Sequence, residues 1–313
     1  MQAISGVCPV LETPFRDDGS VDEEGFIRVI DHMLAAGVRN VMFPGFASEF
    51  HKLSDAERSR LTTILLDRTA AVDGFVAVIS IPDHATRLAV ARAKEAVASG
   101  ARAINILPPY FLGPSRQAVR DHVLAVLQAV APVPAVLQYA PSQTGTALDA
   151  SAIAEIARLA PNLVQVKVES TPPGALITAL SATVPPLESL VGYAGVQLPD
   201  ALRRGAVGVE PGCSFVELYL EVWRLWQDGQ QQDAERLHRR MLPYLSYWMQ
   251  GSELIIAAEK EISQRRGIID SSFCRAPAHR LDGEELAMID RFFSEFAGFL
   301  NTPVPGRSSR QPA

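Results

Sequence analysis

Residues 103–139 read AINILPPYFLGPSRQAVRDHVLAVLQAVAPVPAVLQY, and this stretch contains the repeating unit of the fold. The runs AINIL (103–107) and AVLQY (135–139) are short and almost continuously apolar, as expected of strands that are buried on both faces of a sheet. Residues 116–130, between these runs, form an amphipathic stretch that predicts a helix. A strand, a helix and a second strand in this order are typical of a parallel sheet.

The same alternation continues in both directions from this unit. Further apolar runs that predict strands lie at 5–15, 40–43, 74–81, 163–168, 187–192 and 206–209, and a helical stretch follows each of them. Eight strand–helix pairs favour a closed α/β fold, the (β/α)8 TIM barrel. An open, doubly wound Rossmann-like sheet is the alternative, but its GxGxxG signature does not follow the first strand.

The last third of the chain changes character after Pro211, where it turns helical and predicts a C-terminal helical extension. We expect a barrel at 1–225, a helical segment at 226–301 that packs on the barrel, and a flexible tail at 302–313. Ser54 and Glu57 have the spacing of a capping box, which predicts the start of a helix.

The composition argues against several classes of protein. Of the 313 residues, 48% are hydrophobic, which excludes a mainly disordered chain. The 29 basic and 35 acidic residues give a net charge of −6, which argues against a nucleic-acid partner, because phosphate binding needs a basic face. No apolar run is long enough for a membrane span and no signal-peptide pattern is present, so we expect a cytoplasmic protein without a membrane partner. The cysteines and histidines show no metal-ligand spacing, so we expect no metal. His32, His122 and His238 fall on predicted helices, where we expect surface residues. We also expect no other cofactor, because the lysine chemistry described next provides its own electron sink.

Lys167 is the residue that points most directly to chemistry, because it lies inside the apolar run LVQVKV (163–168). The other lysines, Lys52, Lys94 and Lys260, lie in polar helix or loop stretches. In a barrel the strand ends carry the active site, and burial there lowers the pKa of a lysine. The neutral amine can then form a Schiff base with a ketone. The alternative is a lysine whose charge reaches solvent at the barrel mouth.

Other strand ends also carry polar residues. Glu169 shares a strand face with Lys167 and can act as a general acid or base, although a plain ion pair is the alternative. Gln138 and Tyr139 end the fifth run, and the tyrosine can relay protons or be an ordinary rim residue. The loop GFASEF (45–50) can hold a carboxylate through backbone N–H groups, although an ordinary loop fits the same residues.

Several motifs together resemble the dihydrodipicolinate synthase and N-acetylneuraminate lyase superfamily, the Schiff-base aldolase barrels. The motifs are PVLETPF (9–15), GFASEFHKLSDAER (45–58), NILPPYF (105–111), LQYAPSQTG (137–145), VKVES (166–170) and GAVGVEPG (205–212). The resemblance covers most of the chain and implies a (β/α)8 barrel with a C-terminal helical segment. It also implies an imine between Lys167 and a small-molecule 2-keto acid, and a homotetramer built as a dimer of dimers.

The sequence departs from this family at positions that matter for chemistry. Synthases and lyases usually carry GTTGE or GSTGE in the second loop, where the hydroxyls bind the keto-acid carboxylate, and residues 45–49 read GFASE instead. The family's catalytic tyrosine matches Gln138, with Tyr139 in the next position. The arginine that holds the second substrate of the synthases matches Gln143, and the aromatic residue contributed across the dimer matches Phe111. These departures argue against a true dihydrodipicolinate synthase.

The sequence is more similar to the 2-keto-3-deoxy-L-arabinonate dehydratases of this superfamily. Their second loop reads NFSE, their fifth strand ends in VQDAP followed by SGTAL, and KIE surrounds their lysine. The matching positions here are Ser48–Glu49, Leu137–Pro141, 145–148 and Lys167–Glu169. This similarity implies a carbon–oxygen hydro-lyase that acts on a 2-keto-3-deoxy sugar acid.

The resulting hypothesis assigns a role to each catalytic candidate. Lys167 forms the iminium at C2 of the keto acid. Glu169 or Tyr139 then removes the C3 proton, and Gln138 stands beside them in place of the family tyrosine. Glu49 is interpreted as a brace for the second loop.

Five further residues are predicted to bind substrate. Phe46, Ala47 and Ser48 belong to the second loop, where backbone N–H groups and the serine hydroxyl would hold the carboxylate. Gly192 and Glu210 end the last two strands. Glu210 stands where the family usually has an apolar residue, and we expect it to meet a polar or cationic substrate group.

Two other functions stay open at this point. A pyruvate-dependent aldolase, an aldehyde-lyase, would use the same imine but make or break the C3–C4 bond. A barrel that binds a ligand without turnover is the second alternative, suggested by the lost loop hydroxyls and opposed by the presence of Lys167.

Overall fold

The computed structural model describes residues 4–145 and 148–300. Within these ranges the chain folds into two compact units, and each is described by itself. The first unit contains residues 4–8, Asn40–Phe43 and Thr69–Glu210, and the second contains Pro9–Arg39, Pro44–Arg68 and 211–300. The predicted boundaries at 225 and 301 stay predictions. The predicted tail at 302–313 and part of the motif at 145–148 lie outside the described residues.

The described strands all belong to the first unit and pair in parallel in the order β1-β8-β7-β6-β5-β4-β3-β2. They are β1 (Gly6–Val7), β2 (Asn40–Phe43), β3 (Val76–Ile81), β4 (Ala103–Ile106), β5 (Ala135–Tyr139), β6 (Leu163–Val168), β7 (Glu188–Val191) and β8 (Gly208–Val209). These eight parallel strands form a nearly closed barrel with helices between them along the chain. The predicted (β/α)8 barrel is therefore confirmed.

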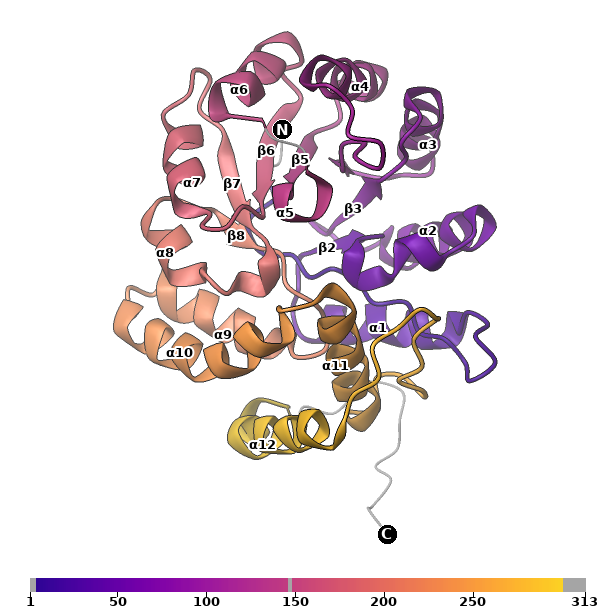
Figure 1. The fold of residues 1–313 in the computed structure, drawn as a ribbon, viewed down its shortest axis with the longest axis vertical. Coiled ribbons are helices and arrows are strands. Elements are labelled where there is room, and N and C mark those ends of the chain that lie inside the picture. The colour runs from indigo at the N-terminus through magenta and orange to yellow at the C-terminus, as the bar shows by residue number, and fades with distance from the viewer. Residues whose placement is uncertain (1–3, 146–147, 301–313) are drawn as a thin grey trace. The chain divides into compact units, whose positions relative to one another are not determined.

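The helices follow the strands in the expected alternation and continue after the last strand. They are α1 (Glu23–Ala35), α2 (Asp55–Thr69), α3 (Thr86–Ala98), α4 (Arg116–Val130), α5 (Pro141–Thr144), α6 (Ala150–Leu159), α7 (Gly174–Ser181), α8 (Leu198–Arg203), α9 (Val216–Gln227), α10 (Gln231–Trp248), α11 (Ser252–Arg265) and α12 (Gly283–Leu300). Short 3-10 turns lie at η1 (Phe46–Ser48), η2 (Phe50–Lys52) and η3 (Tyr193–Gly195). In the first unit, α3, α4, α6 and α7 lie outside the strands (Figure 1).

The strands of the first unit read as apolar runs because both of their faces are buried. All six residues of β3 and all four of β4 are buried. β1 is shorter than the predicted run at 5–15. The Cys8 N–H still donates to the Val209 carbonyl at 2.9 Å, but Pro9 has no N–H with which to extend the ladder.

Side-chain caps fix where several helices begin. The Ser54 N–H donates to Glu57 Oε2 at 2.8 Å and the Glu57 N–H donates to Ser54 Oγ at 3.2 Å, which confirms the predicted capping box before α2. Ser115 and Asp149 accept N–H groups in the same way at the starts of α4 and α6.

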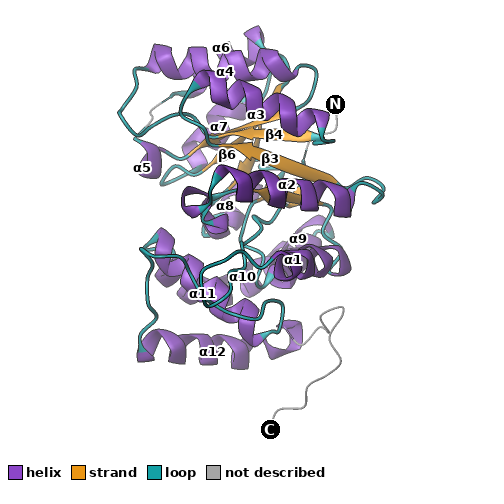
Figure 2. Ribbon diagram, turned by 90° about the vertical axis from the view of Figure 1, so that its right-hand side faces the viewer, coloured by secondary structure: helices purple, strands orange, loops and turns teal. Residues whose placement is uncertain are grey.

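The second unit has an aromatic core of its own, built from α9, α10, α12 and the residue before α9. Phe215, Tyr219, Trp248, Phe292 and Phe296 are each at most 1% exposed. The ring centroids of Phe215 and Phe292 are 5.1 Å apart, and those of Trp248 and Phe292 are 5.3 Å apart. Figure 2 shows α10, α11 and α12 as long helices, and the described residues of this unit contain no strand of the sheet. The all-helical character predicted after Pro211 is thus present from Val216 to Leu300.

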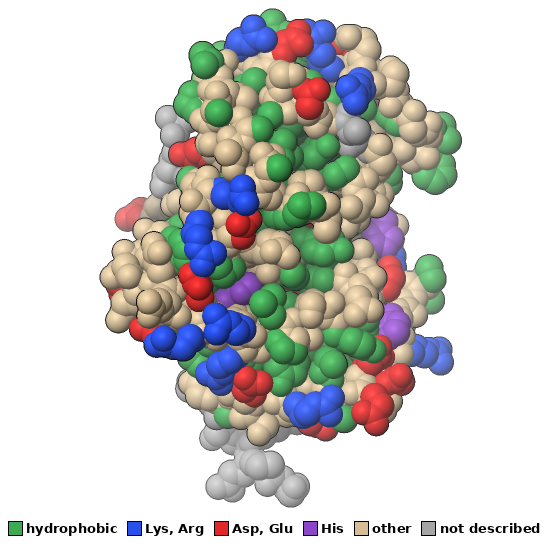
Figure 3. All heavy atoms as spheres, turned by 60° about the vertical axis from the view of Figure 1, so that its left-hand side comes forward, with side chains coloured by type: hydrophobic (Ala, Val, Ile, Leu, Met, Phe, Trp, Pro, Cys, Tyr) green, Lys and Arg blue, Asp and Glu red, His purple; other side chains and the backbone are tan. Residues whose placement is uncertain are grey.

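The surface in Figure 3 carries Lys and Arg side chains mixed with Asp and Glu side chains. This mixing agrees with the small net charge of −6. None of the described helices has the length and the apolar character needed to cross a bilayer.

Three helix histidines correct a simple expectation from sequence. His32, His122 and His238 lie on helices, where we expect exposed residues, yet they are only 1 to 2% exposed. His32 Nε2 lies 3.1 Å from Glu217 Oε1, and His122 Nδ1 lies 3.0 Å from Thr86 Oγ1. These contacts place one nitrogen of each imidazole beside a polar atom, while His122 Nε2 has no hydrogen-bond partner among the described residues.

Candidate active site

Lys167 lies on β6 in the first unit, and 3% of its surface is exposed. In the sheet register it stands between Gln138 of β5 and Leu190 of β7. A lysine at such a position must have charged or polar partners, because a bare buried ammonium is strongly unfavourable.

Two carboxylates provide those partners. Glu169 Oε1 lies 3.5 Å from Lys167 Nζ, and Glu210 Oε2 lies 3.1 Å from the same nitrogen. Glu169 comes two residues after Lys167 and shares its strand face, as predicted. Glu210 directly follows β8, and its backbone N–H donates to the Val191 carbonyl of β7 at 2.9 Å. From sequence, Glu210 was expected to meet a polar or cationic substrate group. In the structure its side chain pairs with Lys167 of the same unit.

A chain of amide and hydroxyl groups extends from Glu169 across the barrel interior. Gln138 Nε2 donates to Glu169 Oε2 at 2.7 Å, and Asn105 Nδ2 donates to Gln138 Oε1 at 2.9 Å. Asn105 Nδ2 also donates to Ser80 Oγ at 2.8 Å. Because a carboxylate only accepts, Glu169 sets the orientation of the Gln138 amide. This chain of hydrogen bonds therefore holds the Oε2 oxygen of Glu169 in place.

Asn105 and Ser80 were not predicted as site residues from the sequence. Both are polar residues inside apolar strand runs, in AINIL and in VAVISI, and both are at most 5% exposed. The signal that identified Lys167, a polar residue in a strand buried on both faces, identifies these two as well.

Gly192 makes room for the Glu169 side chain. A Cβ built at position 192 would lie 2.3 Å from Glu169 Cγ and 2.6 Å from Glu169 Oε1. The next residues, Tyr193 and Ala194, have φ of 56° and 49°, a left-handed conformation that is uncommon outside glycine. The Tyr193 N–H approaches Glu169 Oε1 at 3.5 Å. The turn after β7 is therefore shaped around this carboxylate, and the predicted site residue Gly192 contacts Glu169.

The protonation of Lys167 corrects the expectation of a neutral amine. Burial by itself lowers the pKa of Lys167, but the carboxylates of Glu169 and Glu210 outweigh it and raise the pKa above its ordinary value. Burial likewise raises the pKa of Glu210, and the charge of Lys167 opposes that rise. The amine is an ammonium at rest and must lose a proton before it can attack a carbonyl.

Tyr139 ends β5, next to Gln138. In the register it stands opposite Val168, whereas Gln138 stands opposite Lys167. Side chains alternate along a strand, so Tyr139 points to the face opposite the one that Gln138 and Lys167 share. Of the two bases considered from sequence, this geometry favours Glu169.

The predicted carboxylate-binding residues Phe46, Ala47 and Ser48 belong to the second unit, where they form η1. The Ser48 hydroxyl donates to the Leu11 carbonyl and accepts the Gly45 N–H at 2.9 Å. Its single proton is thus already donated. The Ser48 N–H is also donated, to the Gly45 carbonyl at 3.0 Å, so the prediction that this loop binds a carboxylate rests on the N–H groups of Phe46 and Ala47.

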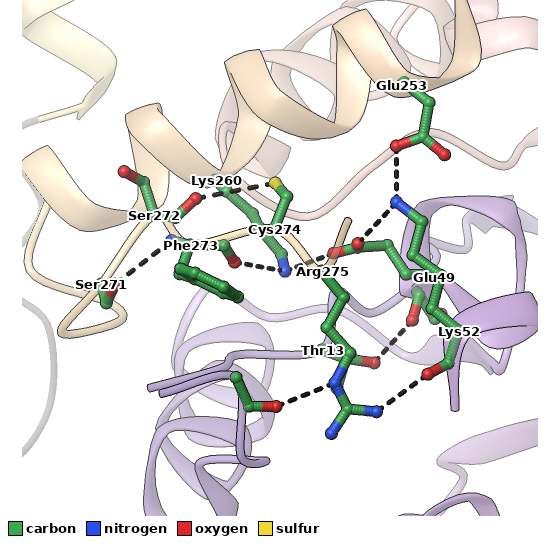
Figure 4. A network of polar contacts seen from close by, with 12 residues as sticks. Thr13, Glu49, Lys52, Glu253, Lys260, Ser271, Ser272, Phe273, Cys274 and Arg275 are labelled. Atoms are coloured by element: carbon green, nitrogen blue, oxygen red, sulfur yellow. Dashed lines mark hydrogen bonds and ion pairs between the residues drawn. The ribbon is translucent and has the colours of Figure 1, made fainter. Parts of the chain in front are cut away.

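Glu49 follows η1 and is fully buried, with φ of 53°. It pairs with Lys260 and lies 3.0 Å from Lys52 Nζ, as Figure 4 shows. Lys260 is also fully buried, with its Nζ 4.2 Å from the ring centroid of Phe15 and 3.0 Å from the Phe273 carbonyl. Lys260 was expected to lie in a polar stretch of helix, but its side chain is buried. The contacts support the interpretation of Glu49 as a brace.

Among the described residues, no three His, Cys, Asp or Glu side chains are grouped so that they could hold a metal ion. The expected cytoplasmic location and the expected homotetramer stay predictions.

Comparison with known proteins gives one consistent result. The sequence profile of the dihydrodipicolinate synthetase family matches residues 3–295. 4-Hydroxy-tetrahydrodipicolinate synthase from Methanopyrus kandleri is 33% identical over 244 residues, which cover 77% of this chain and 80% of that protein. L-2-Keto-3-deoxyarabonate dehydratase from Azospirillum brasilense is 29% identical over 288 residues, which cover 88% of this chain and 89% of that protein.

The fold gives the same assignment. The crystal structure of dihydrodipicolinate synthase from Rhodopseudomonas palustris matches with a TM-score of 0.85 at 25% identity, covering 93% of this chain and 97% of that chain. Members of this family are lyases that act through a Schiff base on small keto acids, and the buried Lys167 fits that class. The profile match, the Methanopyrus relative and the barrel together show that the chain belongs to the dihydrodipicolinate synthetase family of lyases.

Proposed function

We propose that the protein is a Schiff-base hydro-lyase that removes water from a 2-keto-3-deoxy sugar acid, such as 2-keto-3-deoxy-L-arabinonate. One observation carries the proposal, namely a fixed carboxylate beside the buried lysine of the barrel. Glu169 Oε1 lies 3.5 Å from Lys167 Nζ while Gln138 holds Oε2 at 2.7 Å. The 29% identity to the Azospirillum dehydratase, over nearly the whole of both chains, supports the same reaction.

The steps follow from where these groups lie. Lys167, once it has lost a proton, attacks C2 of the keto acid, and loss of one water gives the iminium. The positive nitrogen acidifies the C3 proton, and the Glu169 carboxylate removes it to leave an enamine. The enamine expels the C4 hydroxyl, which leaves as water with the proton that Glu169 carries. Hydrolysis of the remaining imine releases the product and restores Lys167.

The fixed orientation of Glu169 is the reason to prefer this base. A proton-transfer group must lie within hydrogen-bonding reach of the proton it removes. Gln138 occupies Oε2, so Oε1 is the oxygen that faces Lys167 and any carbon attached to its nitrogen. Tyr139 lies on the other strand face. The departures from the synthases at Gln138 and Gln143 support a reaction other than dihydrodipicolinate synthesis.

Borohydride trapping tests the imine, and product analysis tests the reaction. The full chain is incubated with 2-keto-3-deoxy-L-arabinonate or with pyruvate, reduced, and mapped by peptide mass. We expect the adduct on Lys167, none in Lys167→Met, and full trapping in the control Lys94→Met, which alters an exposed lysine of α3. Without borohydride, we expect the sugar acid to lose the mass of one water.

Each other result has a definite meaning. Release of pyruvate together with an aldehyde would assign the aldolase reaction to the same lysine. Absence of an adduct from folded protein with every 2-keto acid tried would refute the lyase and leave the ligand-binding barrel.

A further inference from the structure

Glu210 is a buried carboxylate to which the steps above give no task. Its side chain has no exposed surface, and its Oε2 lies 3.1 Å from Lys167 Nζ. Apart from this contact with Lys167, neither of its oxygens accepts a hydrogen bond from a described residue. Glu169, in contrast, is held by Gln138 on its other oxygen. Of the two carboxylates beside the lysine, Glu210 is therefore the closer and the less constrained.

We propose that Glu210 is a catalytic residue of imine formation, which takes a proton from Lys167 Nζ and delivers it to the oxygen that leaves C2 of the keto acid. The inference rests on the proposed Schiff-base function and deepens it. It divides the acid–base work between two carboxylates, with Glu210 serving the nitrogen and Glu169 serving C3.

The proton balance closes without any other reactant. The ammonium of Lys167 gives one proton to Glu210, and the neutral amine adds to the C2 carbonyl. Glu210 passes this proton to the carbonyl oxygen, then carries a second proton from the nitrogen of the carbinolamine to the same oxygen. The C2–O bond breaks, water leaves, and an iminium with one proton on nitrogen remains. The three protons of the ammonium are then divided between the iminium and the water, and Glu210 is a carboxylate again.

The charges around Glu210 explain why an internal acceptor is needed. Three titratable groups face it, namely Lys167 from β6, Glu169 after β6 and Cys8 after β1. Burial raises the pKa of the Cys8 thiol well above its ordinary value, so it stays protonated. The two carboxylates raise the pKa of Lys167, so release of its proton to bulk water is unfavourable. Transfer over 3.1 Å to Glu210 leaves two neutral groups in place of the ion pair, so it avoids both the release of a proton to solvent and a buried carboxylate without its partner.

A second explanation of Glu210 predicts the opposite result. If Glu210 only held Lys167 in its charged form, its removal would lower the pKa of Lys167 and increase the neutral amine at pH 7. Imine formation would then become faster. If Glu210 carries protons, its removal makes imine formation slower, by about 100-fold, the lower end of what positioned acid–base groups contribute.

The rate of imine formation with pyruvate distinguishes these explanations. Rapid mixing followed by borohydride at increasing times, with intact mass as the readout, gives the rate at pH 7 for wild type, Glu210→Gln and Glu210→Leu. We expect a fall of about 100-fold in both variants with trapping still on Lys167. Glu95→Gln, an exposed carboxylate on α3, is the control and should keep the wild-type rate.

The outcomes separate this inference from the function on which it rests. Wild type that forms no adduct refutes the proposed function itself. Wild type that forms the adduct, with Glu210 variants equally fast or faster, refutes the role of Glu210 and leaves the Schiff base intact. If circular dichroism shows that both variants are unfolded, Glu210→Asp, which keeps the charge but shortens its reach, decides the question. It is expected to slow trapping, and an unchanged rate would overturn the inference.

Discussion

Gly192→Ala tests whether the position of Glu169 controls proton transfer at C3. The added Cβ would lie 2.3 Å from Glu169 Cγ, whereas ordinary contacts of this kind begin at 3.4 Å. The Glu169 side chain must therefore move by about 1 Å, because the Gly192 backbone is held by its N–H bond of 3.0 Å to the Val168 carbonyl. A displacement of about 1 Å at a catalytic group can cost about 100-fold in rate. Overpacking should also cost about 1–3 kcal/mol of folding free energy.

Exchange of the C3 hydrogens of pyruvate for deuterium measures this step alone. NMR in D2O should show exchange about 100-fold slower in Gly192→Ala, while borohydride still traps Lys167. Gly283→Ala is the control, because a Cβ there meets no atom within 4 Å. Exchange at the wild-type rate in folded Gly192→Ala would show that Glu169 is not the base at C3. Equal loss of trapping and exchange would show that the turn acts on Lys167 and not on Glu169.

Two further predictions concern the second unit. Burial raises the pKa of Glu12 to about 7, so the stability associated with its neutral form is complete below the unfolded pKa of about 4.3 and is lost as the pH rises through 7. Glu12→Gln should therefore stabilise the protein at pH 8 relative to wild type, by on the order of 3 kcal/mol, and little at pH 4, as urea unfolding at both pH values would show. Lys260→Met leaves the buried Glu49 with Lys52 alone and should cost about 3–5 kcal/mol, whereas adding Glu49→Gln should recover part of that loss. If Lys260→Met alone were as stable as wild type, that result would contradict the interpretation of Glu49 as a brace.

The barrel and the core of the site could be predicted because they depend on local patterns. Continuous apolar runs identify strands buried on both faces, and an alternation of two residues places Lys167 and Glu169 together. Gln138 stands at the end of its strand in the same register as the lysine. Each of these predictions depends only on residues that are neighbours in the sequence or on an adjacent strand.

The parts that could not be predicted depend on distant contacts. The pairing of Glu210 with Lys167 joins β8 to β6 across the barrel interior, and no local pattern encodes that approach. The raised pKa of Lys167 follows from Glu169 together with Glu210, whereas the prediction from sequence considered burial alone, which lowers the pKa. Lys260 was predicted to lie in a polar stretch because its helix carries several charged residues. Its burial depends on Glu49, more than two hundred residues earlier in the chain.

The charge of the cluster also explains why two carboxylates and one lysine are compatible with the whole reaction. With all three groups ionised, Lys167, Glu169 and Glu210 carry a net charge of −1. When the amine becomes neutral, Glu210 holds the proton, and when the iminium becomes an enamine, Glu169 holds it. The iminium itself has the charge of the ammonium it replaces. The net charge of the buried cluster is therefore constant at every step, which avoids the large cost of creating a new charge where the dielectric is low.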